Sequence, residues 1–457
     1  MGKLPAMAVS NIEELLVGGA EAPRRSVCSG LRYRRRVSAA ADSTLFDGEA
    51  PLAERDRIAA LDVLRGFALL GIFIMNMPGF SHSLFALPTP PATALDAAVA
   101  ALRDLFFAGK FNLLFGFVFG IGFATQMARL DAAERAHAAR LVVAPRRHRA
   151  VHVYLRRLAF LAVVAGVHAM LLWPGDVLLV YTIDGLVLLA VRRLGDRGFA
   201  ALIFACLLFP ALAETARSTT TMFSPATETL LAFELEQLEA SNDRAYGHGS
   251  FVDAVRETAR VFAWSTRSPY GLFTTLAFCV QMATGIFAGY VVGRRGWLTR
   301  HAGAGPPQLV AAALVVAVVG NAIALVGADT LAPALGVGPA VFVAALARTL
   351  GRAALSACYA LAIVRLVGDG TLPPWLRPLQ LAGRMPLTNY LLQTLLASFC
   401  FYGWGLGWWG RADAAFETAL AIALFTCIQL PFSALWLARH RAGPLETLWR
   451  FFTYGSR

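Results

Sequence analysis

Residues 57–80 read RIAALDVLRGFALLGIFIMNMPGF, an apolar stretch interrupted by Asp62, Arg65 and Asn76. A helix of about 20 residues spans the hydrocarbon core of a bilayer, so this stretch is long enough to cross it. A charge inside that core costs at least about 2–3 kcal/mol unless it is paired or hydrated. Because Asp62 and Arg65 are spaced i, i+3, they share one face of a helix and can neutralise each other. We therefore predict a transmembrane helix whose charged face points into a protein interior.

The composition of the whole chain is that of a membrane protein. Of its 457 residues, 57% are apolar and only 15% are charged, which lies outside the range of ordinary soluble domains. A net charge of +12 in a soluble protein would suggest nucleic acid, but here the Arg residues lie between apolar runs, where they set topology. The sequence therefore predicts a polytopic membrane protein with no nucleic-acid partner.

Ten apolar runs are predicted to be transmembrane helices. They cover residues 57–80, 111–127, 158–173, 177–191, 199–213, 270–292, 308–326, 340–367, 386–402 and 416–437. The connections that this count assigns to the cytoplasm are rich in Arg, and the others are acidic or poor in basic residues. We expect an all-α integral membrane protein of about ten transmembrane helices with both termini in the cytoplasm. A re-entrant segment at 327–339 remains an alternative for the seventh and eighth spans.

The spans divide the chain into four parts. Residues 1–55 are expected to be a basic, disordered cytoplasmic tail, which either touches anionic lipid or results from a mis-assigned start. Residues 56–213 form an N-terminal membrane half of five spans, and 270–457 form a C-terminal half of five spans with a basic cytoplasmic tail. Between them, 214–269 is acidic and is predicted to be an extracytoplasmic loop, with a surface helix at 227–240.

The Cys and His pattern does not predict a metal site. Five of the six Cys lie inside apolar runs and one lies in the N-terminal tail, with no C-x-x-C pair. This supports neither a disulfide framework nor a zinc site. The sequence also lacks a Walker loop and a Ser-His-Asp order.

Five stretches resemble, in this order, successive blocks of the YeiB family of bacterial inner-membrane proteins. They read LDVLRGFALLGIFIMN, KFNLLFGFVFGIGF, GVHAMLLWPGDVLLVYTIDGL, GRMPLTNYLLQTLLASFCFYGWGLG and GPLETLWRFFTY. The resemblance covers residues 57–454, and the last two blocks are similar to the C-terminal domain of unknown function typical of that family. Through its LDxxRG segment the chain is more remotely similar to a superfamily of membrane acyltransferases, which includes the lysosomal heparan-glucosaminide N-acetyltransferase.

The resemblance implies a multi-pass protein of the bacterial inner (plasma) membrane. The superfamily implies acyl transfer across the bilayer, from a cytoplasmic donor such as acetyl-CoA or another acyl-CoA to a small-molecule or glycan acceptor outside, with no covalently bound cofactor. In the glucosaminide enzyme a His in the first outer loop is proposed as catalytic. His82 lies in the comparable loop here, so the resemblance implies His82 as one candidate.

His168 and Asp176 are the candidates for catalysis that the residues themselves indicate. His168 lies within an apolar span, where an imidazole can act as a general base or form a transient acyl adduct. Asp176 would orient it, but about 12 Å of ideal helix separates the two positions, so the pair requires a break at Pro174. The alternative is that His168 only forms a helix-to-helix hydrogen bond.

Other polar residues in the spans are candidates for binding a substrate or donor. Arg suits bidentate binding of phosphate or carboxylate, so Arg65, with Asp62, is predicted to hold the donor. Arg384, which falls loosely on one face with Asn389 and Gln393, could line the same cavity. The alternatives are a structural ion pair for Asp62 and Arg65 and helix-to-helix hydrogen bonds for the others. Asn76 in the first span is assigned to the same group.

Two further sites are predicted with an alternative beside each. Arg348 and Arg352, one turn apart, could stabilise an oxyanion or an anionic acceptor on the outer side, or could instead reach the membrane interface from a shorter span. Asp184 lies near the centre of a short span and is either a proton-relay group of a transporter or a structural carboxyl.

The function that fits these residues best is acyl transfer by a membrane-embedded enzyme. Its partners would be the lipid bilayer, a small-molecule or glycan acceptor and a second copy of the chain in a homodimer. A secondary transporter or exporter is the main alternative, because intramembrane charges and a basic inner face are equally natural there. A non-catalytic membrane scaffold is the third, since a fold does not establish an activity.

Overall fold

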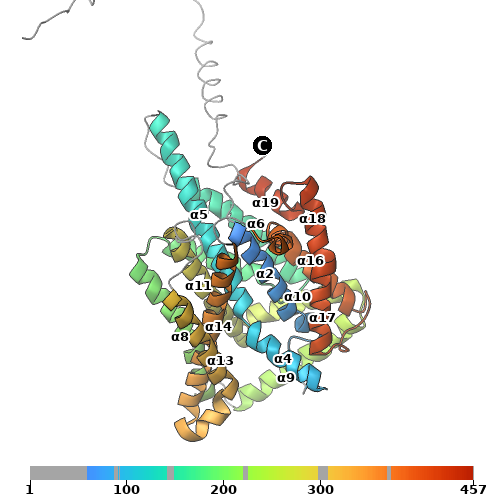
Figure 1. Cartoon of the computed structure of the whole chain (residues 1–457). Coiled ribbons are helices and arrows are strands. Elements are labelled where there is room, and N and C mark those ends of the chain that lie inside the picture. The colour runs from blue at the N-terminus through green and yellow to red at the C-terminus, as the bar shows by residue number, and fades with distance from the viewer. Residues whose placement is uncertain are drawn as a thin grey trace, which may run out of the picture. The chain divides into compact units, whose positions relative to one another are not determined.

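The chain folds into helices throughout the part that the structure describes. The computed structural model describes residues 59–86, 91, 93–141, 149–219, 225–296, 307–367 and 372–455, all within the compact unit Gly48–Arg457. These ranges contain no strand, which confirms the predicted all-α class (Figure 1). The predicted tail at 1–55 lies outside the described residues.

The described residues from 59 to 296 contain ten α-helices. Their bounds are α2 Ala59–Asn76, α3 Pro78–Ser81, α4 Ala94–Phe106, α5 Lys110–Leu141, α6 Arg149–Leu171, α7 Leu178–Val191, α8 Asp196–Thr219, α9 Pro225–Asn242, α10 Phe251–Arg267 and α11 Pro269–Arg294. A π-helical turn, η2, covers Asp243–Gly247 between α9 and α10.

The described C-terminal part is also helical. Its α-helices are α13 Pro307–Leu335, α14 Val337–Val367, α15 Arg377–Gly383, α16 Pro386–Phe401, α17 Ala414–Leu424, α18 Leu430–Arg439 and α19 Pro444–Tyr454. A 3₁₀ turn, η3, covers Pro374–Leu376, and a π-helical stretch, η4 at Phe425–Gln429, joins α17 to α18.

Eight of the described helical segments are long and apolar enough to cross a membrane. Each of the ten predicted spans falls on helical residues, but α7 and α16 are not among these eight segments. α7 has 14 residues and α16 has 16 residues, which corresponds to about 21 and 24 Å of helix, less than the hydrocarbon core. Both short helices carry residues of the candidate site described below.

The region predicted to be a possible re-entrant segment is a kinked helical hairpin. Gly327 has a φ of 77°, which interrupts α13, and Gly336, with a φ of 83°, forms the turn into α14. Both values lie in the left-handed region that Gly adopts without steric cost. The bulk of 327–339 therefore continues α13 and begins α14.

The segment predicted to be a long loop, 214–269, is mostly helical. It contains α9, which includes the predicted surface helix at 227–240, followed by η2 and α10. A capping box starts α10, because the Ser250 side chain accepts a hydrogen bond from Asp253 N and Asp253 accepts one from Ser250 N. The Ser250 hydroxyl, and then its backbone N–H, lower the pKa of Asp253. Local capping thus orders a stretch that hydropathy alone marks only as polar.

Glycines allow the backbones of two helix pairs to touch. A Cβ on Gly383 would lie 1.8 Å from the Asp62 carbonyl oxygen, and one on Gly66 would lie 1.9 Å from that of Leu379, so α2 and α15 pack at backbone distance. Between α5 and α11, a Cβ on Gly289 would lie 1.9 Å from the Phe117 carbonyl oxygen. Small residues at such interfaces are typical of membrane helix pairs.

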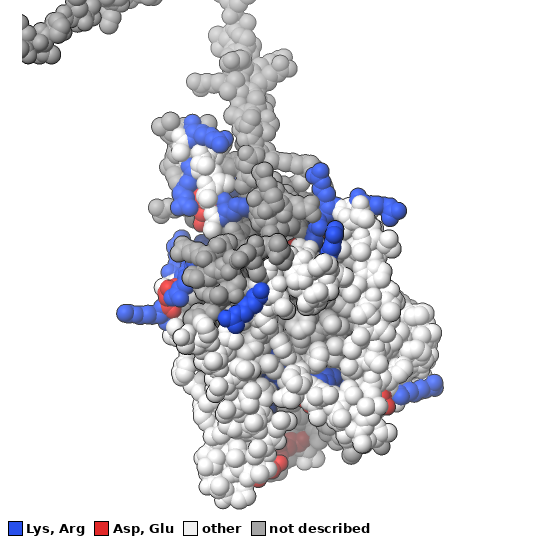
Figure 2. Space-filling model, viewed as in Figure 1, with Lys and Arg blue, Asp and Glu red and all other residues white. Residues whose placement is uncertain are grey.

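On the face drawn in Figure 2, basic side chains are concentrated toward one end of the described unit. Figure 2 shows most of the Lys and Arg around the upper end, near the ends of α5 and α19, above a largely uncharged face. Large apolar side chains are exposed on the outside of the helices, such as Val163 at 65% and Phe204 and Leu325 at 66% each. Lipid would cover such a surface, which supports a multi-pass membrane protein.

Candidate active site

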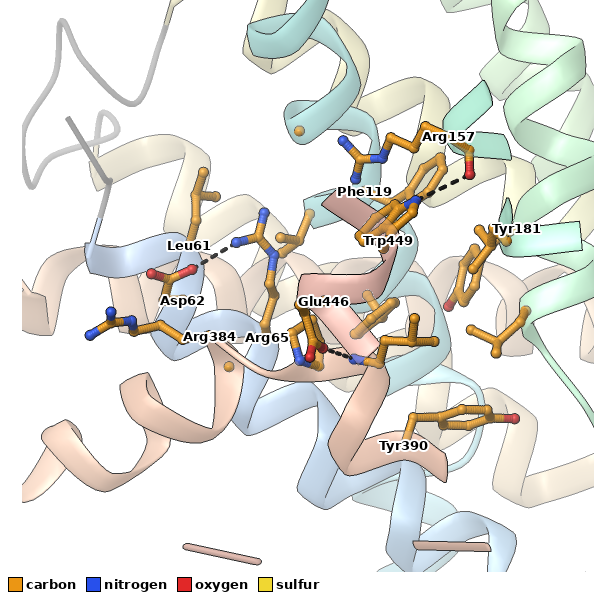
Figure 3. A pocket seen from close by; sticks show the side chains of 18 of the residues that line it. Leu61, Asp62, Arg65, Phe119, Arg157, Tyr181, Arg384, Tyr390, Glu446 and Trp449 are labelled. Atoms are coloured by element: carbon orange, nitrogen blue, oxygen red, sulfur yellow. Dashed lines mark hydrogen bonds and ion pairs between the residues drawn. The ribbon is translucent and has the colours of Figure 1, made fainter. Parts of the chain in front are cut away.

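A cavity of about 420 Å³ lies among α2, α5, α6, α7, α16 and α19. Its size is within the range of small-molecule sites in proteins. Figure 3 shows Asp62, Arg65 and Arg384 on the left of the cavity and Tyr181 and Tyr390 on the right. The cavity therefore has two ends of different chemistry.

We call the first end the arginine mouth. It is formed by two acidic residues, Asp62 and Glu446, and by five arginines, Arg65, Arg129, Arg157, Arg384 and Arg450. Arg65 Nη1 donates to Asp62 Oδ1 at 2.7 Å, and the Arg65 side chain is 29% exposed. All five arginines are half-buried, and they outnumber the carboxylates. The mouth therefore favours an anionic ligand.

A network around Arg157 fixes one wall of the arginine mouth. Arg157 Nη1 donates to Gln126 Oε1, and the guanidinium lies over the Trp449 ring at 4.2 Å from its centroid. Gln126 Nε2 donates to the Tyr454 hydroxyl at 3.0 Å, and Trp449 Nε1 donates to the Arg157 carbonyl at 3.2 Å. These contacts hold α19 against α5 and α6, so the last helix of the chain forms part of the wall.

Glu446 connects α19 to the short helix α16. It accepts hydrogen bonds from Leu387 N at 2.7 Å, Thr388 N at 3.1 Å and Thr388 Oγ1 at 2.6 Å, which satisfies the first amides of α16. Burial raises the pKa of Glu446, and the hydrogen bonds from Thr388 oppose that effect. The carboxyl group therefore serves as an N-terminal cap supplied by another helix.

The middle of the cavity is apolar. Its walls are formed by side chains of α2, α5 and α6, namely Leu69, Ile72, Phe115, Val118, Phe119 and Leu161. From Asp62 to Ile72 the α2 helix rises about 15 Å, so the apolar residues lie progressively farther from the arginine mouth. This part of the cavity suits a hydrocarbon or a slender uncharged chain.

The other end, which we call the tyrosine end, is buried. Val177, Tyr181 and Tyr390 line it. The Tyr181 hydroxyl donates to the Asn112 carbonyl at 3.0 Å, which places this end beside the first turn of α5. The Tyr390 hydroxyl accepts from Val177 N at 3.3 Å and donates to Asp176 Oδ1 at 3.4 Å. Tyr390 thus touches the cavity on one side and Asp176 on the other.

His168 and Asp176 meet directly behind the tyrosine end. α6 ends at Leu171, a turn through Pro174 follows, and His168 Nδ1 lies 2.8 Å from Asp176 Oδ1. The break that the sequence required at Pro174 is therefore present. Asp176 Oδ2 also accepts from Leu179 N at 2.8 Å, which caps the start of α7. The side chains are 0% and 1% exposed, so the pair is sealed from solvent.

Two residues near His168 were missed by the sequence analysis. His168 Nε2 lies 2.8 Å from Thr394 Oγ1, and the Tyr390 ring centroid lies 5.2 Å from that of the imidazole. Tyr390 and Thr394 are spaced i, i+4 on α16, so they share a helix face. That spacing was visible in the sequence, but nothing there indicated that the face meets α6.

Asn389 and Gln393 on α16 form helix-to-helix hydrogen bonds, which was the alternative to a role in the cavity. Asn389 Nδ2 donates to Ser433 Oγ at 2.9 Å, and Gln393 Nε2 donates to Gln429 Oε1 at 3.2 Å and to the Leu69 carbonyl at 3.1 Å. Both side chains are buried and neither lines the cavity. Arg384, by contrast, lines the arginine mouth.

Three predicted site residues lie away from this cavity. His82 Nδ1 lies 2.9 Å from Ser81 Oγ and 3.5 Å from Glu417 Oε1, and Glu417 also accepts from Arg103 at 2.6 Å. Arg348 pairs with Glu214 at 3.3 Å. Asn76 is the last residue of α2. The structure thus brings together Asp62, Arg65 and Arg384 at one end and His168 and Asp176 at the other, without these three residues.

The fold and the cavity define a multi-pass membrane protein with an arginine-lined internal chamber that leads to a buried His–Asp pair. Within the described ranges, no group of three or more His, Cys, Asp or Glu side chains could hold a metal ion. Residues 292–456 match a family described as protein of unknown function, DUF418.

Similar proteins extend over most of the chain. YxaH of Bacillus subtilis (strain 168) is 28% identical over 423 residues, which cover 89% of this chain and 96% of the relative. An uncharacterised 39.9 kDa protein in the amylase 3' region of Bacillus acidopullulyticus is 28% identical, with 89% and 96% covered. YeiB of Escherichia coli (strain K12) is 27% identical, with 87% and 96% covered. These matches confirm the predicted resemblance to the YeiB family. All three relatives are named as uncharacterised, so acyl transfer stays a prediction.

Proposed function

We propose that this protein transfers an acyl group from an acyl-CoA donor on the cytoplasmic side of the membrane to an acceptor in the cell envelope. The observation that supports the proposal is the cavity itself, which connects a half-exposed arginine mouth with a buried end beside His168 and Asp176. The mouth fits the anionic part of such a donor, and the buried end offers a base. The apolar middle fits the uncharged chain between them.

The donor would bind with its phosphates in the arginine mouth. Guanidinium groups form bidentate hydrogen bonds with phosphate, and five of them line this end. The basic upper end in Figure 2 would face the cytoplasm by the positive-inside rule. The apolar walls would then take the arm that carries the acyl group, so that its carbonyl approaches the tyrosine end.

His168 would act as the general base. A carboxylate only accepts hydrogen bonds, so the Asp176 contact fixes the hydrogen on Nδ1 and leaves the lone pair on Nε2 available. An imidazole oriented in this way can take a proton from an attacking hydroxyl or amine. Tyr390 lines the cavity and its ring packs 5.2 Å from the imidazole, whereas His168 does not line the cavity. The Tyr390 side chain would therefore have to move during transfer.

Binding and transfer of a labelled donor test the proposal. Purified protein in detergent is incubated with radiolabelled acetyl-CoA, and bound label is measured by equilibrium dialysis at increasing salt. We expect saturable binding that unlabelled CoA displaces and that weakens as salt screens the mouth. Addition of lipid and glycan extracts from a bacterial envelope should then move the label into the extract. The absence of both binding and transfer would refute the proposal.

A secondary transporter is a second candidate, because of one buried carboxyl group. Asp184 in α7 is 3% exposed, and its Oδ2 atom receives no hydrogen bond from the described residues. Buried carboxyls of this kind take part in proton relays of transporters. Counterflow of a labelled anionic solute in proteoliposomes that is abolished by Asp184→Asn would favour this function. Unchanged counterflow in that variant would argue against it.

A further inference from the structure

We infer that Thr394 is a catalytic nucleophile that carries the acyl group as an ester between the donor and the acceptor. The inference rests on the proposed function and deepens it. The His168 imidazole joins Thr394 to Asp176 through two contacts of 2.8 Å each, from Nε2 to Thr394 Oγ1 and from Nδ1 to Asp176 Oδ1. Hydroxyl, imidazole and carboxylate in this order are the arrangement that activates a hydroxyl nucleophile.

The Thr394 hydroxyl bonds differently from those of three buried threonines in other helices and, like Thr388 and Thr258, contacts a side chain of another element. Thr182, Thr284 and Thr349 each donate to the carbonyl four residues earlier in their own helix, at 2.9, 3.5 and 3.0 Å. This bond is the usual way for a helical Thr to satisfy its hydroxyl away from water. Thr394 instead contacts the imidazole of α6. Its hydroxyl therefore lies where His168 can remove its proton.

Thr394 lies between the donor cavity and a second, smaller hollow. Thr394 lines a small hollow of about 20 Å³ between the end of α6, α10 and α16, whose walls include Leu172, Val255 and Trp404. Tyr390, one turn earlier on α16, lines the donor cavity. One turn of helix rises about 5 Å, so α16 places one side chain in each hollow with His168 beside both. An ester on Thr394 would face the hollow opposite the donor cavity.

The chemistry balances without any added oxidant, reductant or metal. Thr394 Oγ1 attacks the thioester carbonyl carbon of the donor, and His168 Nε2 takes the hydroxyl proton. The C–S bond breaks, the thiolate receives that proton, and free CoA and a threonine ester result. In the second half, the acceptor hydroxyl or amine attacks the ester carbonyl, His168 takes its proton and returns it to Oγ1, and the acylated acceptor leaves.

The experiment traps the ester in the absence of an acceptor. Full-length protein is mixed with labelled acetyl-CoA, quenched in acid and digested, and the peptide that contains Thr394 is analysed by mass spectrometry. We expect at most one acyl group per chain, located on Thr394, together with one equivalent of released CoA. Thr394→Ser should keep the adduct, and Thr394→Val should lose it and lower transfer at least about 100-fold. The control Thr349→Ala removes a buried hydroxyl whose hydrogen bond goes to its own helix, and it should leave adduct formation and transfer unchanged.

Other outcomes separate this inference from the proposed function. Transfer that persists in Thr394→Val, or a label that is found on His168 and lost rapidly at neutral pH as an acyl-imidazole, would refute the role of Thr394 and leave acyl transfer intact. A lower melting temperature in Thr394→Val with no adduct in the unmutated protein, despite transfer, would show that Thr394 has a structural role alone. Absence of donor binding in every variant would refute the proposed function itself.

Discussion

The acid–base pair that lines the cavity and the pair behind its tyrosine end differ in exposure, although their contacts are of almost equal length. Arg65 and Asp62 lie 2.7 Å apart with side chains that are 29% and 6% exposed, whereas His168 and Asp176 lie 2.8 Å apart with side chains that are 0% and 1% exposed. A partly exposed guanidinium can contact a ligand from the solvent side while it keeps its buried partner. A sealed pair keeps its geometry, because breaking it leaves buried polar groups without partners. Under the proposed function, the first pair would bind the charge of the donor and the second would perform the chemistry.

Replacement of the sealed base should have the largest effect. We expect His168→Gln to lower acyl transfer about 100- to 10,000-fold while donor binding is retained, because general-base catalysis contributes a factor of that order. Transfer of label and equilibrium binding of acetyl-CoA measure the two properties separately. His440→Gln is the matched control, since His440 is exposed at the end of α18. Equal loss of transfer in both variants would contradict the assignment.

Replacement of Arg65, the partly exposed member of the first pair, should act on binding instead. Arg65→Ala is expected to weaken donor binding about 10-fold, equivalent to about 1.4 kcal/mol, with little change in the maximal rate. Arg65→Lys should restore part of the affinity, because an ammonium group binds phosphate without the bidentate geometry. The exposed Arg439 at the end of α18 provides the control Arg439→Ala. A lower maximal rate with normal donor binding in Arg65→Ala would contradict the assignment of this residue to donor binding.

The substitution Gly383→Ala, which adds a methyl group between α2 and α15, should displace the part of α2 that carries Asp62 and Arg65. The Cβ of Gly383→Ala would lie 1.8 Å from the Asp62 carbonyl, so the helices must separate. Overpacking of this kind costs about 1–3 kcal/mol, and we expect a lower melting temperature together with weaker donor binding. Gly166→Ala in α6 meets no atom within 4 Å and serves as the control. Normal donor binding in a destabilised Gly383→Ala protein would show that this contact does not shape the mouth.

The smallest expected effect is a pH dependence from Glu446. Burial raises the pKa of Glu446 above its ordinary value of 4.5, so the folded state holds the proton more tightly than the unfolded state. The stabilisation is complete below about pH 4.5 and is lost as the pH rises through the folded pKa. Glu446→Gln keeps acceptor and donor positions for Leu387 and Thr388 and should flatten this dependence. Melting temperature against pH in detergent measures it, and an unchanged slope would contradict the assignment.

The contacts of the site between residues close together in the sequence could be predicted from the sequence. The i, i+3 spacing indicated the contact between Asp62 and Arg65, and Pro174 marked the break that lets Asp176 reach His168. Both are local relations that backbone geometry determines. The all-α class followed from hydropathy for the same reason. The two short spans, predicted at 177–191 and 386–402, agree within one residue with α7 and α16.

The remaining parts depend on how distant helices pack. Nothing in the sequence brings Thr394 to His168, 226 positions earlier in the chain, or sets Trp449 against Arg157. His82 was implied by a resemblance of loops, but the structure pairs it with Ser81 and Glu417. Hydropathy reports which residues are apolar and gives no distances between helices. Such contacts are accessible only from the folded chain.

The segment that matches the family of unknown function forms only part of the cavity wall. Residues 292–456 contribute the walls from α15, α16 and α19, whereas α2, α5, α6 and α7 come from the preceding part of the chain. Expressed by itself, that segment would leave Arg384 and Trp449 facing lipid or detergent in place of their partners. A fragment chosen by the boundaries of the family match should therefore fail to bind any donor, and functional assays require the chain from α2 onward.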